Sequence, residues 1–169
     1  MQDELKSVTY FRNFVFGVED SLVSTVGLLS GIAAASVSKS VILITGTVLI
    51  FVEAFSMGAG SFLSEHSAED YIYRGSSNSR KPVVSSIIMF FSYLISGLIP
   101  LVPYIILPIK YALWISILLS LVFLFVLGVI SGKVTKTGIS KSALRMFVVG
   151  GIAILIGALV GKTLHELNN

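Results

Sequence analysis

Five long apolar segments dominate this sequence, and they leave few folds open to it. A helix needs about 20 apolar residues to cross the roughly 30 Å hydrocarbon core of a bilayer, and each segment supplies about that number. We expect spans over residues 14–36, 40–62, 83–107, 112–132 and 143–162, with the second helix continuing to residue 73. The sequence therefore predicts an all-α integral membrane protein with five transmembrane helices, folded as a single membrane domain over residues 1–169.

The composition argues against a soluble domain. Only 12% of the residues are charged and 54% are hydrophobic, whereas a soluble domain is about 25% charged. Too few polar residues remain to cover the outer faces of five soluble helices. The N-terminus lacks the basic start, short apolar core and cleavage site of a signal peptide, so we expect the first span to be an uncleaved anchor.

The lysines and arginines predict how the spans are oriented, because cytoplasmic loops carry an excess of these residues. With the N-terminus inside, nine of the twelve lie on the cytoplasmic side and three on the other. The inner set is Lys6, Arg12, Arg74, Arg80, Lys81, Lys133, Lys136, Lys141 and Arg145, and the outer set is Lys39, Lys110 and Lys162. We therefore expect a cytoplasmic N-terminus and, with five spans, a C-terminus outside.

Glu53, near the middle of the second span, is the most informative single residue. An ionisable group at that depth costs on the order of 2.5–3.5 kcal/mol on insertion scales, and such groups usually face a bundle interior or an ion path. Glu53 shares a helix face with Met57, one turn further on. A carboxylate beside a thioether suits a borderline divalent transition ion better than Mg²⁺ or Ca²⁺. The alternatives are a protonated Glu53 that only packs, and a Met57 that only fills space.

The same spacing continues toward the cytoplasmic surface through Ser61, Glu65 and Glu69. Each step of four residues drifts by about 40° on an ideal helix, so the series forms a slow spiral. We expect a cation leaving the cytoplasm to meet this acidic end of the helix first. The alternative is a solvated helix end without a binding role.

Asp20 lies about two turns into the first span and shares a face with Ser24, Gly27 and Gly31. The two glycines form a GxxxG pattern, which lets another helix approach closely. A dimer seam through this face would bring two Asp20 carboxylates together as a divalent-cation site. The alternative for Asp20 and its neighbour Glu19 is an acidic first turn that favours the helix N-terminus.

Other chemistries lack support in the sequence. The absence of cysteine excludes disulfides, thiolate metal sites and thiol nucleophiles. The sequence has no P-loop, no H-E-x-x-H motif, no glycine-rich dinucleotide fingerprint and no basic aromatic patch. The two histidines are not placed for a catalytic triad. We therefore expect no enzyme activity, no bound cofactor and no nucleic-acid partner.

The segments, taken in order, resemble the vacuolar iron transporter family. "FRNFVFGVEDSLVSTVGLLSGIAAA" is similar to the first-helix pattern "GxxDGLxxxxGLxxGxAGA", and "EAFSMGAGSFLSEHSAED" to the second-helix pattern "GAxSMxxGEYLSxxSQ". "SGLIPLVPY" resembles the third-helix "GGLIPLLPY", and "FVLGVISGKVT" the fourth-helix "FLGxxKGRLT". "KSALRMFVVGGIAILIGALVGKTL" resembles the fifth helix. Because the match covers nearly the whole chain in the same order, it is far more specific than any one motif.

The resemblance implies a five-helix homodimer that exports Fe²⁺, and often also Mn²⁺, from the cytosol while protons move the other way. It implies an ion path at the dimer interface, lined by an aspartate and a methionine that match Asp20 and Met57. The chain departs from the family pattern at Ser21, where the family has glycine, and at Ser61, where it has glutamate. Glu53 is not carried over from the family, so its role depends on the physical argument alone.

Many eukaryotic members carry a glutamate-rich cytoplasmic domain between the second and third helices, where this chain has only residues 74–82. We therefore expect a short form that lacks the metal-binding domain, in which Glu65, Glu69 and Asp70 are its minimal substitute. We expect the metal site to comprise Asp20, Glu53, Met57, Glu65 and Glu69.

The predicted partners are a second copy of the chain, the lipid bilayer, Fe²⁺ or Mn²⁺, and protons. The short chain without a targeting sequence suggests a multi-pass protein of a prokaryotic cell membrane. Two alternatives stay open. One is an exporter of another cation on the same scaffold, and the other is a membrane scaffold or interaction subunit that transports nothing.

Overall fold

Five helices make up the computed structural model of the chain, which describes residues 2–74 and 80–167. They are α1 (Gln2–Ala34), α2 (Lys39–Tyr73), α3 (Lys81–Ile106), α4 (Ile109–Thr135) and α5 (Ile139–Leu167). All five are long and apolar enough to cross a membrane, judged by length and composition. This confirms the predicted all-helical fold and the predicted number of membrane-spanning helices.

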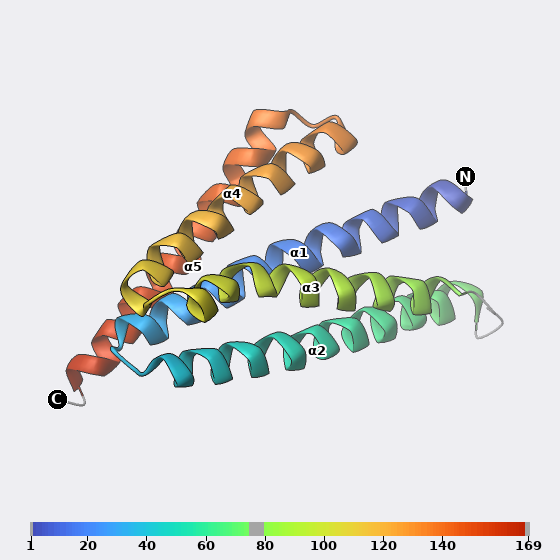
Figure 1. The fold of residues 1–169 in the computed structure, drawn as a ribbon. Coiled ribbons are helices and arrows are strands. Elements are labelled where there is room, and N and C mark those ends of the chain that lie inside the picture. The colour runs from blue at the N-terminus through green and yellow to red at the C-terminus, as the bar shows by residue number, and fades with distance from the viewer. Residues whose placement is uncertain (1, 75–79, 168–169) are drawn as a thin grey trace.

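The helices form two groups that come together at one end of the molecule. Figure 1 shows α1, α2 and α3 running side by side, while α4 and α5 form a hairpin whose turn lies away from them. α1 joins the groups, because it packs extensively against both α3 and α5. The N-terminus and the C-terminus lie at opposite ends of the bundle (Figure 1), as five consecutive antiparallel helices require.

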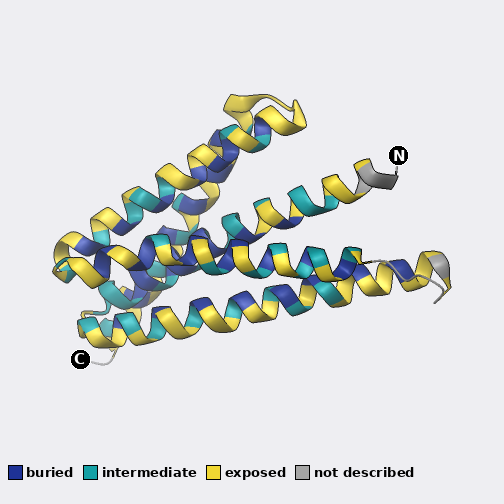
Figure 2. Cartoon of the chain, turned by 45° about the vertical axis from the view of Figure 1, so that its right-hand side comes forward, coloured by how far each residue is buried: buried dark blue, intermediate teal, exposed yellow. Residues whose placement is uncertain are grey.

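The distribution of side chains is that of a protein surrounded by lipid. Large apolar side chains such as Phe55, Trp114 and Leu159 are exposed, at 71%, 68% and 65%. Figure 2 shows exposed residues along the outer sides of the helices and buried ones where helices face each other. Many buried positions carry a hydroxyl group: Ser21, Thr25, Ser30, Ser85, Ser92, Ser96, Ser116 and Ser120. Small and hydroxyl residues at helix contacts are typical of membrane bundles, where lipid solvates the apolar faces.

Two apolar clusters hold the bundle together. One lies near the α1–α2 and α3–α4 turns and includes Leu29, Ile50 and Tyr104. The other joins α1 to the α4–α5 hairpin through Leu22, Leu124, Leu127 and Met146. Both clusters involve α1, which is therefore the central helix of the fold.

Glycines allow α1 and α5 to approach at backbone distance. A Cβ atom added to Gly31 would lie 2.6 Å from the carbonyl oxygen of Gly157, which is closer than real Cβ contacts. Gly27 and Gly161 belong to the same contact. Within one chain, the close helix approach that the GxxxG pattern predicts is made between α1 and α5.

Candidate metal site

Two carboxylates from different helices lie within the apolar spans. Asp20 of α1 and Glu53 of α2 are both partly buried, and they lie close enough for their charges to interact. Tyr93 of α3 is fully buried and interacts electrostatically with both carboxylates. The structure thus brings together two of the predicted site residues that are 33 positions apart in the sequence. Two like charges in a low-dielectric environment repel each other, and a divalent cation between them would remove that repulsion.

A hydrogen-bonded network fixes the α1–α3 side of this carboxylate pair. The hydroxyl groups of Ser24 and Tyr93 share a hydrogen bond of 2.7 Å. Ser21 donates from its Oγ to the backbone carbonyl of Tyr93 at 2.6 Å, so the departure from the family's glycine has a structural use here. Tyr93 is not among the site residues predicted from the sequence, although a tyrosine deep in an apolar span needs a polar partner.

Glu19, the neighbour of Asp20, has a different environment. It is partly buried, and its charge interacts with that of Arg145 on α5. Glu19 therefore interacts with Asp20 and with a basic residue of the α4–α5 hairpin, whereas Asp20 also interacts with Glu53 of α2.

A polar cavity of about 660 Å³ lies between α1, α2 and α3. Its wall consists of Arg12, Asn13, Phe16, Ser56, Met57, Gly60, Ser61, Ser64, Glu65 and Met89. It therefore brings together Met57 and Glu65, two of the predicted site residues, while Asp20, Glu53 and Glu69 lie outside its lining. Met89 adds a second thioether to the wall, and nothing in its sequence context distinguishes it from a methionine that fills a gap.

Two polar atoms on the cavity wall have no hydrogen-bond partner. Asn13 Nδ2 and Ser61 Oγ are buried, and neither has a partner within the described residues. Buried polar groups are nearly always paired with protein or ordered water. Water or a hydrated cation in this cavity would supply the missing partners.

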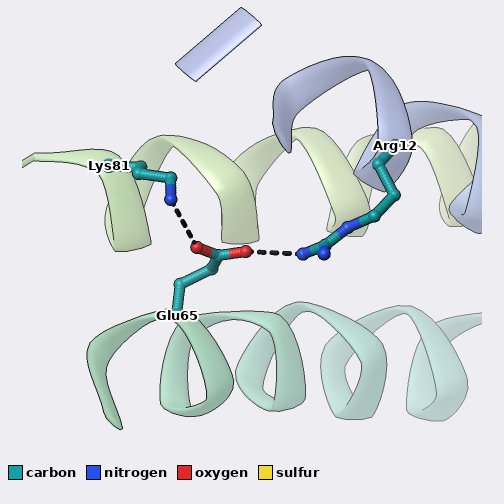
Figure 3. Close-up of polar contacts among 3 residues, drawn as sticks. All are labelled: Arg12, Glu65 and Lys81. Atoms are coloured by element: carbon teal, nitrogen blue, oxygen red, sulfur yellow. Dashed lines mark hydrogen bonds and ion pairs between the residues drawn. The ribbon is translucent and has the colours of Figure 1, made fainter. Parts of the chain in front are cut away.

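Glu65 is buried, and both of its carboxylate oxygens are held by cationic side chains (Figure 3). Arg12 Nη2 of α1 lies 2.6 Å from Oε1, and Lys81 Nζ of α3 lies 2.9 Å from Oε2. From the sequence, Arg12 and Lys81 contribute only to the predicted orientation of the spans. Their contacts join residues far apart in the chain, and no local pattern indicates them.

The acidic residues beyond Glu65 differ in exposure. Glu69, one turn further along α2, is buried with 7% exposure. Asp70 is exposed and lies 3.6 Å from Nε2 of His66, whose ring stacks on Phe62. Among the described residues, no three His, Cys, Asp or Glu side chains are grouped closely enough to hold a metal ion. The predicted site residues of one chain are therefore divided between two places: Asp20 and Glu53 form the carboxylate pair, and Met57 and Glu65 line the cavity.

The chain is similar in sequence to one family of known proteins. The VIT family model matches residues 11–81 and 73–162. Vacuolar iron transporter 1 of Tulipa gesneriana is 23% identical over 216 residues, covering 92% of this chain and 87% of the relative. The protein of the same name from Arabidopsis thaliana is 22% identical, with coverages of 92% and 86%. An uncharacterized protein of Methanocaldococcus jannaschii is 27% identical, with coverages of 86% and 84%. This chain is short relative to the vacuolar iron transporters.

Proposed function

The chain belongs to the VIT family, and from that premise we propose that it transports a divalent transition metal, Fe²⁺ or Mn²⁺, out of the cytosol. Membership confirms the resemblance predicted from the sequence, and relatives named vacuolar iron transporter indicate iron as the cargo. The observation that carries the proposal is that Asp20 of α1 and Glu53 of α2, both within apolar spans, lie close enough to interact electrostatically. Charged groups at that depth usually mark an ion path.

The path that we propose begins at the polar cavity. Met57 lines this cavity and lies one helical turn from Glu53 on the same face of α2. An ion would exchange part of its water shell for the Met57 thioether and then for the two carboxylates. Mixed thioether and oxygen ligands favour a transition metal over Mg²⁺ or Ca²⁺.

We propose that two copies of the chain complete the site. With each carboxylate bound through one oxygen, the carboxylate pair and Met57 supply three donor atoms, fewer than the four to six that such ions take, and a second copy would double them. A groove of about 690 Å³ with an almost wholly apolar lining, formed by α1, α2 and α5, includes Ser24 and Leu49. This groove offers a second copy an apolar surface on the same helices as the carboxylate pair.

Proton antiport would follow from the same carboxylates. Binding of a proton to Glu53 or Asp20 from the outer side would remove the negative charge that holds the metal and release the ion. Uptake into vesicles would then track an imposed proton gradient. Transport that ignores a gradient of either sign would contradict antiport while leaving metal transport intact.

The decisive experiment measures entry of Fe²⁺ and Mn²⁺ into proteoliposomes that enclose a metal-quenched dye. We expect Glu53→Gln, Asp20→Asn and Met57→Leu each to lower the initial rate by at least about tenfold, the effect of losing roughly 1.4 kcal/mol of binding. Glu166→Gln, which removes an exposed carboxylate at the end of α5, is the matched control and should keep the wild-type rate.

The same assay separates the alternatives. Competition by Co²⁺ or Ni²⁺ stronger than that by Fe²⁺ would indicate another cation on the same scaffold. Absence of entry for every divalent metal, in protein that remains folded, would favour a scaffold subunit. The proposed membrane is that of a prokaryotic cell, and the relatives include an archaeal protein as well as plant proteins.

A further inference from the structure

Three charged residues from three helices meet at the edge of the polar cavity. They are Arg12 of α1, Glu65 of α2 and Lys81 of α3, here called the Glu65 triad (Figure 3). The Glu65 side chain is only 8% exposed, so both of its oxygens are withdrawn from water and engaged by cations. The metal transport proposed above does not explain why a candidate ligand should be occupied in this way.

The two cations of the triad are not equivalent. Arg12 lines the cavity together with Glu65, and Lys81 does not. The Arg12 side chain is 67% exposed, whereas that of Lys81 is 24% exposed and belongs to the first residue of α3. Because the Arg12 side chain stays largely in water while it is paired, it is the partner that can move away when an arriving cation takes its place at the buried carboxylate. Lys81 is the more permanent partner.

The charges of the triad determine what an arriving ion meets. Glu65 is the one carboxylate among the residues that line the cavity, and with its two partners it forms a group of net charge +1. A metal ion can bind the Glu65 oxygen that Arg12 contacts only when the Arg12 guanidinium moves away from it. A divalent ion interacts with the carboxylate twice as strongly as a monovalent ion at equal distance, so it can replace Arg12 where a monovalent ion gains nothing.

We propose that Arg12 is an internal competitor for the cation at Glu65, and that this competition selects divalent over monovalent ions at the entrance to the path. The inference rests on the proposed function, which it deepens by naming a specificity-determining residue. Arg12 contributes one nitrogen, Nη2, to the contact. A lysine at this position therefore retains both the charge and a single donor.

The test measures the initial rate of Mn²⁺ entry into proteoliposomes as a function of Mn²⁺ concentration. We expect Arg12→Gln to lower KM by about two- to fivefold, which corresponds to roughly 0.4–1 kcal/mol of competition removed, with the maximal rate nearly unchanged. The variant should also become sensitive to inhibition by Na⁺ or K⁺. Arg12→Lys should resemble the wild type. Lys141→Gln removes the same charge from an exposed position at the start of α5 and should leave KM unchanged.

Other outcomes would overturn the inference in ways that differ from failure of the proposed function. If the wild type transports Mn²⁺ and Arg12→Gln has an unchanged or higher KM, the proposed transport is supported and the role of Arg12 as a competitor is refuted. A variant recovered only in aggregated form would assign Arg12 to structure and would also overturn it. If the wild type transports nothing, Mn²⁺ binding is measured in detergent by electron paramagnetic resonance of the free ion. Tighter binding by Arg12→Gln would then support competition, and equal or absent binding would refute it.

Discussion

Ser21 shows at the scale of one residue how a departure from the family pattern adds a contact between helices. Its hydroxyl donates to the Tyr93 carbonyl at 2.6 Å and so connects α1 to α3. The family pattern has glycine at this position, which would leave that carbonyl without this partner. The departure therefore stabilises the position of Tyr93 beside Asp20 and Glu53, and it adds no metal ligand.

Replacement of Ser21 should lower the stability of the protein without changing its transport rate. We expect Ser21→Ala to lower the free energy of unfolding by about 0.6–1 kcal/mol, the usual contribution of such a bond in a membrane bundle. Ser21→Gly should cost about 1 kcal/mol more, because glycine is unfavourable inside a helix. Thermal unfolding in detergent measures both effects. Transport rates should stay near wild type, and a rate that falls with either variant would assign Ser21 a direct role in the ion path.

The contact between α1 and α5 gives a prediction at the scale of elements. A Cβ atom on Gly31 would meet a backbone carbonyl of Gly157, which cannot rotate away as a side chain can. We expect Gly31→Ala to destabilise the protein by about 1–3 kcal/mol, as overpacking typically does. Gly151→Ala on α5 is the matched control, because its Cβ would meet nothing within 4 Å. Equal unfolding temperatures for the two variants would contradict this packing.

At the scale of elements, hydropathy and spacing predict where the helices lie in the sequence but not which helices pack against each other. The five apolar segments predict five helices because burial in lipid depends on composition, which is local. The partners of Glu65 are 53 positions before it and 16 after it. That arrangement depends on α3 packing against both α1 and α2, which no local pattern encodes. Tyr93 and Met89 of α3 lie near the predicted site residues through helix packing as well. α3 carries no carboxylate, so its sequence does not indicate a site.

The orientation of the whole molecule can be tested because the chain has no cysteine. Ser38→Cys lies between α1 and α2 and Thr137→Cys between α4 and α5, at opposite ends of the bundle. With a cytoplasmic N-terminus, a membrane-impermeant maleimide should label Ser38→Cys on intact cells. Thr137→Cys should react only after permeabilisation. The reverse pattern would show that the bias in lysine and arginine had been misread.

The position of the glycine contact on α1 has a mechanical consequence. At 1.5 Å per residue, Asp20 is about 17 Å from Gly31 and Arg12 about 28 Å. A rigid helix pivoting at its glycines by 10° would displace the backbone at Asp20 by about 3 Å and at Arg12 by about 5 Å. The larger displacement exceeds the 2.6 Å that separates Arg12 from Glu65. A tilt of α1 about its contact with α5 would therefore displace Arg12 farther than Asp20, so the distance between Arg12 and Glu65 would be the more sensitive of the two to movement of this helix.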